Sequence, residues 1–246
     1  MFFTGFKTEI EAMRIPMQFL PDRFMLDNFE QIFTRFNFLR FYRNTLVVTV
    51  SVAIPQVFLS AMAAYSFARI NFPLRHVLFV SLMTAFMIPL QMILVPRYVL
   101  MMNLGWIDTL TGVIVPAIPS VFATFFIRQA VMGVPRELDE SAYMDGANHG
   151  TIFLFIIIPL IKSTLAAMGI LVVTFAWNQL LWPLIILNSN SNFTLAVGIA
   201  GLRGQHGTPF NLLMAAATIS TLPMIIVFLF GQRFFLEGIA TTGSKN

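Results

Sequence analysis

The stretch that decides the fold is 163-STLAAMGILVVTFAWNQLLWPLIIL-187, which contains no Asp, Glu, Lys or Arg side chain. A helix needs roughly 20 mostly apolar residues to cross the hydrocarbon core of a bilayer, and this run is long enough. A charge at the centre of such a helix costs about 2.5 to 3.5 kcal/mol on insertion, so long gaps between charges mark candidate spans. The run therefore predicts a membrane-spanning helix.

Similar charge-poor runs occur along the whole chain. The polar cluster NSNSNFT, at 188–194, must leave the bilayer and separates the last two of them. Prolines inside the runs are tolerated in membrane helices when neighbouring groups satisfy the freed carbonyls. We therefore expect an all-α membrane protein, a polytopic bundle of kinked helices that forms one domain over residues 1–246. Its five spans are predicted at about 44–68, 76–96, 109–127, 163–187 and 211–231.

The composition supports a membrane domain and excludes several classes of function. Apolar residues make up 57% of the chain and charged residues 11%, with a mean hydropathy of +0.80, whereas soluble domains carry about 25% charge. Cysteine is absent, which excludes disulfides and Cys-ligated metals. The three histidines fall in different loops or span ends, so no metal site and no catalytic site is predicted. The net charge of +4 is spread along the chain and predicts no nucleic-acid partner.

The distribution of Lys and Arg gives an orientation. If the loop after the first span is cytoplasmic, the short outside loops carry only Arg97 and Arg203 and the inside loops carry more basic residues, as the positive-inside rule requires, and the C-terminus is cytoplasmic. This arrangement exports about 7–43, which are rich in arginine and have no helix before them to lead translocation. Since Met1 to Phe6 is apolar, we expect it to be the end of a sixth, upstream span that this sequence lacks, with 7–43 as an external loop.

A charged segment separates the third and fourth spans and is predicted to be a cytoplasmic loop at about 128–162. From Val134 to Lys162 it reads VPRELDESAYMDGANHGTIFLFIIIPLIK. Pro135 suits a first helical position, and the acidic residues that follow suit the positive end of a helix dipole. Leu138, Ala142 and Gly146 are four apart and form a narrow stripe that permits close docking on another protein. The plainer alternative is a solvated connector between two spans.

This segment resembles the EAA loop, E-A-A-x-x-D-G-A and then F, I and L-P, of the membrane subunits of ATP-binding-cassette importers. It departs from that pattern at Ser141, which is usually Ala, and at Ile158, which is usually Leu. Eight positions match over a short stretch: Glu140, Ala142, Asp145, Gly146, Ala147, Phe153, Ile156 and Pro159.

The resemblance extends over most of the chain and is to the carbohydrate branch of that family, specifically its second, shorter permease. It rests on TGFKT (4–8), AAYSFARINFP (63–73), WNQLLWPLIIL (177–187), TLAVGIA (194–200) and FGQRFFLEGIATTGSKN (230–246). It implies a sugar-importing permease subunit of the cytoplasmic (inner) membrane that performs no catalysis. The implied partners are a second permease, an ATPase dimer that binds ATP and Mg²⁺, an external solute-binding protein and membrane lipid.

In that family the EAA helix couples the ATPase to the membrane bundle. Carried over, Glu140, Ala142, Asp145, Gly146, Ala147 and Pro159 would form the docking element. The resemblance also implies that the loop containing Gly201 to Gly207 touches the solute-binding protein. GIATTGSK, at 238–245, nearly spells a phosphate-binding loop but reverses its last two residues, so we expect this chain to bind no cofactor.

Polar and aromatic residues at the span ends allow two interpretations. Gln56, Gln91, Asn178 and Gln179 could line a translocation path or form hydrogen bonds between helices. Trp177 and Trp182 could contact sugar, but membrane-interface anchoring is the commoner role of tryptophan near the end of a span. We take interhelical bonding and anchoring as the expectations, and keep Gln91, Asn178 and Gln179 as path candidates.

Three alternatives to a sugar permease stay open. A related importer for a non-sugar solute would share the coupling loop. A secondary transporter would need an ionisable residue at mid-membrane, and the predicted spans contain none. A membrane scaffold could use its cytoplasmic loop to recruit a soluble partner without transporting anything.

Overall fold

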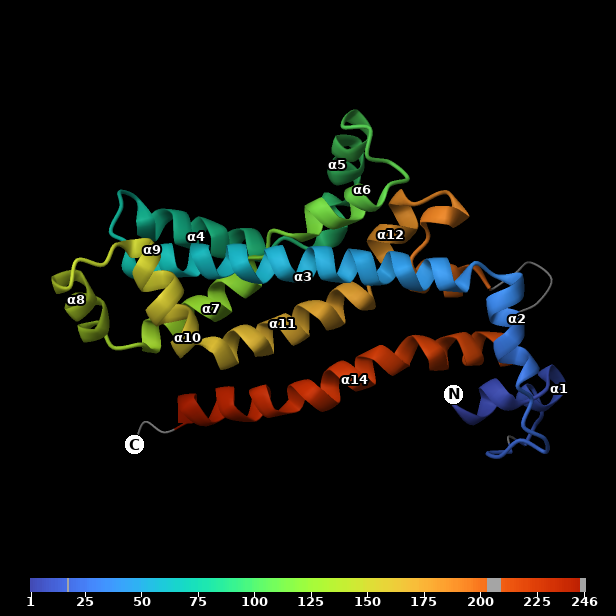
Figure 1. Cartoon of the computed structure of the whole chain (residues 1–246). Coiled ribbons are helices and arrows are strands. Elements are labelled where there is room, and N and C mark those ends of the chain that lie inside the picture. Colours follow the sequence, from blue (N-terminus) through green and yellow to red (C-terminus); the bar gives the residue numbers. More distant parts are fainter. Residues whose placement is uncertain (17, 203–208, 244–246) are drawn as a thin grey trace. The chain divides into compact units, whose positions relative to one another are not determined.

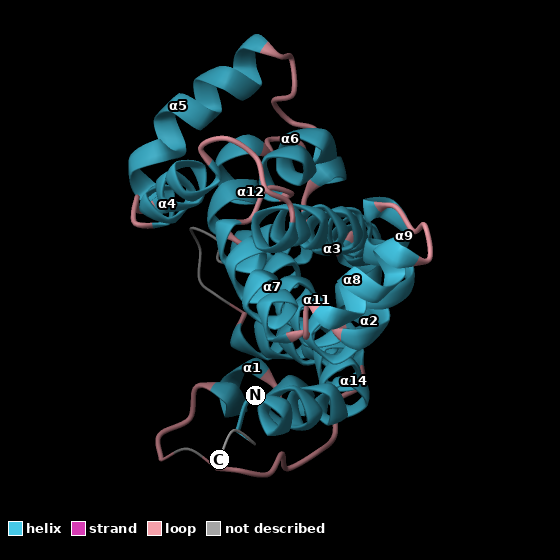
Figure 2. Ribbon diagram, turned by 90° about the vertical axis from the view of Figure 1, so that its left-hand side faces the viewer, coloured by secondary structure: helices cyan, strands magenta, loops and turns pink. Residues whose placement is uncertain are grey.

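The computed structural model describes residues 1–16, 18–202 and 209–243, and within these ranges every regular element is a helix (Figure 1, Figure 2). The α-helices are α1 (Glu9–Ala12), α2 (Asp27–Arg35), α3 (Phe38–Arg69), α4 (Arg75–Phe86), α5 (Leu90–Asn103), α6 (Leu110–Ile114), α7 (Val121–Gly133), α8 (Glu137–Met144), α9 (His149–Ile152), α10 (Ile158–Leu160), α11 (Lys162–Trp177), α12 (Leu181–Ile186), α13 (Leu195–Gly201) and α14 (Phe210–Gly243). Short 3-10 helices are η1 (Phe3–Phe6), η2 (Val115–Ala117) and η4 (Asn190–Asn192), and η3 (Phe153–Ile157) is a π-helix.

The helices belong to two compact units that are interleaved along the chain. The first unit comprises Met1–Thr49, Met101–Val113 and Trp177–Val227. The second comprises Val50–Leu100, Ile114–Ala176 and Phe228–Asn246. Because α3 and α14 each contribute to both units, each unit is described by the contacts that lie inside it.

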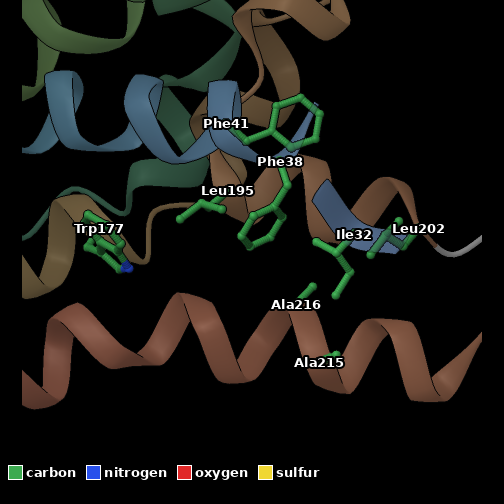
Figure 3. Packing of buried hydrophobic residues seen from close by; sticks show 8 residues of the cluster. All are labelled: Ile32, Phe38, Phe41, Trp177, Leu195, Leu202, Ala215 and Ala216. Carbon is green, nitrogen blue, oxygen red and sulfur yellow. The ribbon is translucent and has the colours of Figure 1, made fainter. Parts of the chain in front are cut away.

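The core of the first unit is built from side chains that are far apart in the sequence. Phe38 and Phe41, at the start of α3, face Leu195 of α13 and the small residues Ala215 and Ala216 of α14 (Figure 3). Trp177 closes the cluster, and its Nε1 donates a hydrogen bond to the Ser220 carbonyl at 3.0 Å. Small residues let α14 approach the aromatic rings closely. Ile32 and Leu202 complete the buried set.

The second unit packs α4 against α7 through aromatic rings and one arginine. The Phe86 ring stacks on the Phe122 ring, with centroids 6.2 Å apart, and the Phe122 and Phe126 ring centroids lie 6.1 Å apart. The Arg128 guanidinium lies 4.1 Å from the centroid of the Phe79 ring, and its Nε donates to the Phe67 carbonyl at 3.4 Å. These contacts give the Arg128 charge partners on neighbouring helices. They explain why α7 continues to Gly133, past the end at residue 127 that the charge pattern predicts.

Four described helices or helix pairs are long and apolar enough to cross a membrane: Phe38–Arg69, Leu110–Gly133, Lys162–Ile186 and Phe210–Gln232. They overlap the predicted spans at 44–68, 109–127, 163–187 and 211–231. The helix α3 begins six residues before the predicted span and so includes Arg40 and Arg43, which the sequence pattern assigned to a loop.

The predicted span at 76–96 is not one helix. It is the pair α4 and α5, which meet at an angle of 99°. Pro89 explains the break, because a residue that precedes proline is pushed out of the α region and proline cannot donate a helical hydrogen bond. The pair counts as a fifth span only if it crosses as a broken helix.

The run that decided the fold is also interrupted. The helix α11 ends at Trp177, and α12 begins at Leu181. Pro183 cannot donate a hydrogen bond to the Gln179 carbonyl, so this turn lacks one of the bonds that an unbroken helix would have. The break therefore falls at the polar pair Asn178 and Gln179, which the apolar average of the run concealed.

The expected external loop at 7–43 contains two helices, α1 and α2, in addition to the first residues of α3. Thr8 caps α1 as one half of a capping box with Glu11. Buried Asn28 of α2 donates from Nδ2 to the carbonyls of Gly5 and Lys7 at 2.9 and 2.8 Å. The Nδ2 of Asn211, in α14, donates to Asn28 Oδ1 at 2.9 Å. A hydrogen-bonded asparagine thus attaches this region to the first unit.

The interface role expected for the two tryptophans is wrong. Trp177 and Trp182 are buried, with exposed fractions of 5% and 0%. Each indole N–H reaches a backbone carbonyl of the first unit, that of Ser220 for Trp177 and that of Gly112 for Trp182. A buried indole satisfies its donor within the protein, which the sequence alone did not predict.

Candidate functional site

The candidate site is the helix α8 and the turn that follows it. The helix begins at Glu137, two residues after Pro135, and its first turn carries Glu137, Asp139 and Glu140. No side chain caps the start of this helix. Negative charge in the first turn stabilises it instead, through the helix dipole. Asp139 is the only buried residue in α8. All the other side chains of this helix therefore offer surface to a partner.

The exposed face of α8 carries the residues that the EAA pattern singles out. Glu140 and Asp145 are exposed, and Ala142 and Ala147 are half-buried. Met144, which the pattern leaves unspecified, has an exposed fraction of 88%. An exposed methionine flanked by carboxylates on a short helix is well suited to enter a groove on another protein.

Gly146 ends the helix through its backbone conformation. Its φ is +83°, a left-handed value that favours glycine. The N–H of Gly146 bonds to the Tyr143 carbonyl at 3.0 Å and the N–H of Ala147 to the Ala142 carbonyl at 2.9 Å, which together form a Schellman motif. No atom lies within 4 Å of a Cβ built on Gly146, so within this chain glycine is required for its φ and not for space.

The chain turns directly from α8 into the next helix. Asn148 caps α9, because its Oδ1 accepts a hydrogen bond from the Thr151 N–H at 2.9 Å. The π-helix η3 follows, and Pro159 lies exposed in α10. Each hydrogen bond in a π-helix joins residues five apart, one more than in an α-helix, and such segments are often found at functional sites. The predicted loop at 128–162 is thus a nearly continuous series of short helices between α7 and α11.

Two attachments join α8 to the end of α3 within the second unit. Arg69 Nε lies 2.9 Å from Asp139 Oδ2, and both side chains are at least 90% buried. Arg69 also donates to the Val134 carbonyl at 2.6 Å. At the other end of α8, the Tyr143 hydroxyl lies 2.6 Å from His149 Nδ1, and the Tyr65 hydroxyl lies 3.2 Å from the same nitrogen.

This arrangement was not predicted from the sequence. The acidic residues after Pro135 were expected only to favour a helix start, and Arg69 was given no role. The signal available was an acidic residue next to Glu140 and an arginine at the end of a span. No local pattern pairs two residues separated by this length of chain.

The path candidates lie in different parts of the structure. Gln91 is exposed on α5, in the second unit. Asn178 and Gln179 lie in the break between α11 and α12, in the first unit. Gln56 is half-buried within α3. Most of the loop at Gly201 to Gly207 lies outside the described residues.

The site has no catalytic arrangement among the residues that the structure describes. No group of three or more His, Asp and Glu side chains in the described ranges could hold a metal ion. His149 lies within hydrogen-bond distance of the Tyr65 and Tyr143 hydroxyls and joins their helices. What α8 presents is exposed surface that carries Glu140 and Met144.

The sequence and the fold of this chain are similar to those of known proteins. The sequence profile described as "Binding-protein-dependent transport system inner membrane component" matches residues 56–240. An arabinooligosaccharides transport system permease protein of Halalkalibacterium halodurans is 36% identical over 244 residues, which cover 98% of this chain and 88% of that protein. An sn-glycerol-3-phosphate transport system permease protein of Brucella abortus is 30% identical over 250 residues, covering 98% and 89%.

A solved structure shares the fold. It is the crystal structure of a bacterial ABC transporter involved in the import of the acidic polysaccharide alginate, with a TM-score of 0.85 and 20% sequence identity. The match covers 95% of this chain and 88% of that chain. A second structure, of the alginate transporter in complex with an alginate pentasaccharide-bound periplasmic protein, matches with a TM-score of 0.58.

Proposed function

Because the chain belongs to the family of binding-protein-dependent transport system inner membrane components, we propose that it is the second, shorter permease subunit of an ATP-driven sugar importer. The observation that carries this proposal is the identity of 36% to an arabinooligosaccharide permease over 98% of the chain. The relatives named for sn-glycerol 3-phosphate widen the solute class to sugars and sugar-like polyol phosphates.

The partners proposed for the chain are a second permease, two copies of an ATPase and an external solute-binding protein. ATP and Mg²⁺ would bind to the ATPases, and this chain would perform no catalysis. Closure of the ATPases on nucleotide would draw the docking helices together and open the cavity between the two permeases outward. Hydrolysis would then reset the cavity and release the solute inside.

The docking element proposed for the ATPase is α8 with its C-terminal turn, comprising Glu140, Ala142, Asp145, Gly146 and Ala147. Pro159 would position the start of α11 relative to this element. Support comes from the exposure of Glu140, Met144 and Asp145 and from the Schellman turn that fixes the direction of the chain after the helix. This assignment requires the loop and the C-terminus to be cytoplasmic. Gln91, Asn178 and Gln179 remain the proposed path residues.

Two measurements test the proposal. Uptake of labelled arabino-oligosaccharide and of sn-glycerol 3-phosphate is measured in cells that lack this chain and in cells where it is restored. We expect restored, ATP-dependent uptake of one of them, and uptake that continues without the ATPase would favour a secondary transporter. Mass measurement of the intact complex should find one copy of this chain, one other membrane subunit and two ATPases. A chain isolated alone would overturn the proposal.

The docking assignment has its own test. Replacing Glu140 by Arg reverses a charge on the exposed face of α8, and we expect loss of ATPase from the purified complex with normal amounts of the chain in the membrane. Full transport by this variant and by Gly146→Arg would overturn the assignment of α8 as the docking helix.

A further inference from the structure

We propose that Arg69 is a positioning residue that fixes α8 to the end of α3, so that a displacement of the docking helix moves this long apolar helix with it. The inference rests on the proposed docking function of α8. It assigns a role to an ion pair of the buried Asp139, whereas Glu140 and Met144 of the same helix are exposed.

Tertiary contacts hold α8 in place. A helix of eight residues is too short to be stable alone in water and depends on tertiary contacts. In α8 the only buried residue is Asp139, so the helix buries no apolar stripe against the rest of the second unit. Its principal buried contact is therefore the ion pair with Arg69.

The Arg69 guanidinium can hold two elements at once because its donors form a rigid planar fork. Nε faces Asp139 Oδ2 at 2.9 Å, and a terminal nitrogen donates to the Val134 carbonyl at 2.6 Å. Val134 directly follows α7, and Asp139 lies in the first turn of α8. One side chain at the last position of α3 therefore fixes both the end of α7 and the start of α8.

The second attachment lies at the other end of α8 and uses the same part of α3. Tyr65, four residues before Arg69, shares His149 Nδ1 with Tyr143 of α8. The Tyr65 ring also packs on Phe153, with centroids 5.4 Å apart. Contacts at both ends of α8 fix its direction as well as its position, so α8 cannot pivot about a single point.

Different residues of α8 bind the ATPase and pass its movement on to α3. The exposed face of α8 is available to the ATPase, and the buried side contacts α3 through the Arg69–Asp139 ion pair and through His149, which Tyr65 and Tyr143 share. Removing the Asp139 charge should leave the exposed face unchanged and loosen the link to α3. Nucleotide-driven movement would then displace α8 without moving the span by the same amount.

The experiment uses the whole importer, with its own second permease, ATPases and solute-binding protein, reconstituted in lipid vesicles. Two quantities are measured with labelled arabino-oligosaccharide or sn-glycerol 3-phosphate as probe: the rate of ATP hydrolysis and the number of solute molecules imported per ATP. Asp139→Asn removes the charge and keeps the shape. The matched control is Glu30→Gln, which removes one exposed negative charge from α2, outside the docking helix.

For Asp139→Asn we expect retained ATPase association, continued hydrolysis and a fall of about tenfold in solute imported per ATP, the size typical of coupling losses. The control should match the unmodified chain. The exchanged pair Arg69→Asp with Asp139→Arg should recover part of the ratio. Arg69→Lys should give an intermediate ratio, because lysine keeps the charge and loses the fork.

An unchanged ratio in Asp139→Asn would overturn the inference. So would parallel loss of the chain from the membrane in Asp139→Asn and in Arg69→Lys, because the pair would then serve folding alone. Failure of the docking proposal is a separate result, namely full ATPase association and transport with Glu140→Arg.

Discussion

Trp182 donates a hydrogen bond from its indole Nε1 to the carbonyl oxygen of Gly112 at 2.9 Å, across 70 residues of sequence. The side chain of Trp182 is completely buried. The bond joins α12 to α6 inside the first unit, and Gly112 lets the two segments approach. A Cβ added at Gly112 would lie 2.3 Å from the Trp106 carbonyl oxygen and 2.8 Å from Ile186 Cδ1.

Replacing Gly112 by Ala should therefore destabilise the first unit. The clash is with a backbone oxygen, which cannot move aside as a flexible side chain can, and overpacking of this kind costs about 1 to 3 kcal/mol. We expect a lower midpoint of thermal unfolding in detergent. Gly133→Ala is the control, because no atom lies within 4 Å of a Cβ built there. Equal midpoints for the two variants would contradict the close approach.

The pKa of Asp108 makes the loop after α12 sensitive to acid. Burial raises this pKa, but hydrogen bonds from Ser189 and from the backbone N–H of Asn188 outweigh it and lower the pKa to about 2. The Asn188 and Ser189 N–H groups lie 2.9 Å from Oδ1. The folded state therefore binds fewer protons than the unfolded state, whose carboxyl has a pKa near 4.

The contribution of Asp108 to stability should be complete above about pH 4 and disappear as the pH falls toward 2. The measurement compares the unfolding midpoint of the unmodified protein with that of Asp108→Asn from pH 6 to pH 2. We expect the Asn variant to be less stable at pH 6, with the difference shrinking on acidification. A difference that is constant over this range would contradict the assignment of the shift to Asp108.

Substitutions at Gly146 should rank by their tolerance of a left-handed conformation. We expect transport to fall in the order Gly, Asn, Ala, Val, because Asn visits this region more readily than other residues and an L residue there costs roughly 1 to 2 kcal/mol. Transport and the amount of chain in the membrane are measured together. If close approach of the ATPase were the sole requirement, the small Ala would instead outperform the larger Asn.

Asn28→Asp should release the N-terminal segment from the first unit. The side chain is buried, and its two N–H donors face the carbonyls of Gly5 and Lys7. A carboxylate would place negative charge against both oxygens, and the loss of bonds at a buried polar site costs about 1 to 3 kcal/mol.

Limited proteolysis measures this effect. We expect faster cleavage of the Asn28→Asp variant in the exposed stretch at 18–20, with α3 intact. The exposed Asn103, at the end of α5, provides the control as Asn103→Asp. Equal cleavage rates for both variants would show that Asn28 does not hold the segment.

The helical class and most of the long helices were predictable because the signal is local. Gaps between charges, such as that from Asn44 to Ala68, indicate where an apolar helix can form. The breaks between α4 and α5 and between α11 and α12 were harder to predict. Pro89 and Pro183 lie in runs as apolar as the unbroken ones, and Pro55 lies inside the continuous helix α3, so proline alone does not decide between a kink and a break.

The candidate site was predictable in part. The motif identified the position of α8 and its terminal glycine, since both depend on neighbouring residues. The role of Arg69 was not predictable, because arginine is common at the ends of membrane spans. Its role depends on Asp139, which is distant in the sequence. The tryptophans were misplaced for the same reason. An indole is compatible with an interface or a core, and the choice depends on whether a carbonyl lies within reach.

The sequence by itself determined that this chain is helical and apolar enough to span a membrane. It also determined that the chain contains a short acidic helix that ends at Gly146. Hydropathy, capping and the left-handed turn are properties of adjacent residues. Only the tertiary structure decided that Asp139 faces inward and Glu140 outward, and that Trp182 is buried. A charge or an indole donor can be buried only where another segment supplies its partner, and for Asp139 and Trp182 that partner comes from a distant helix.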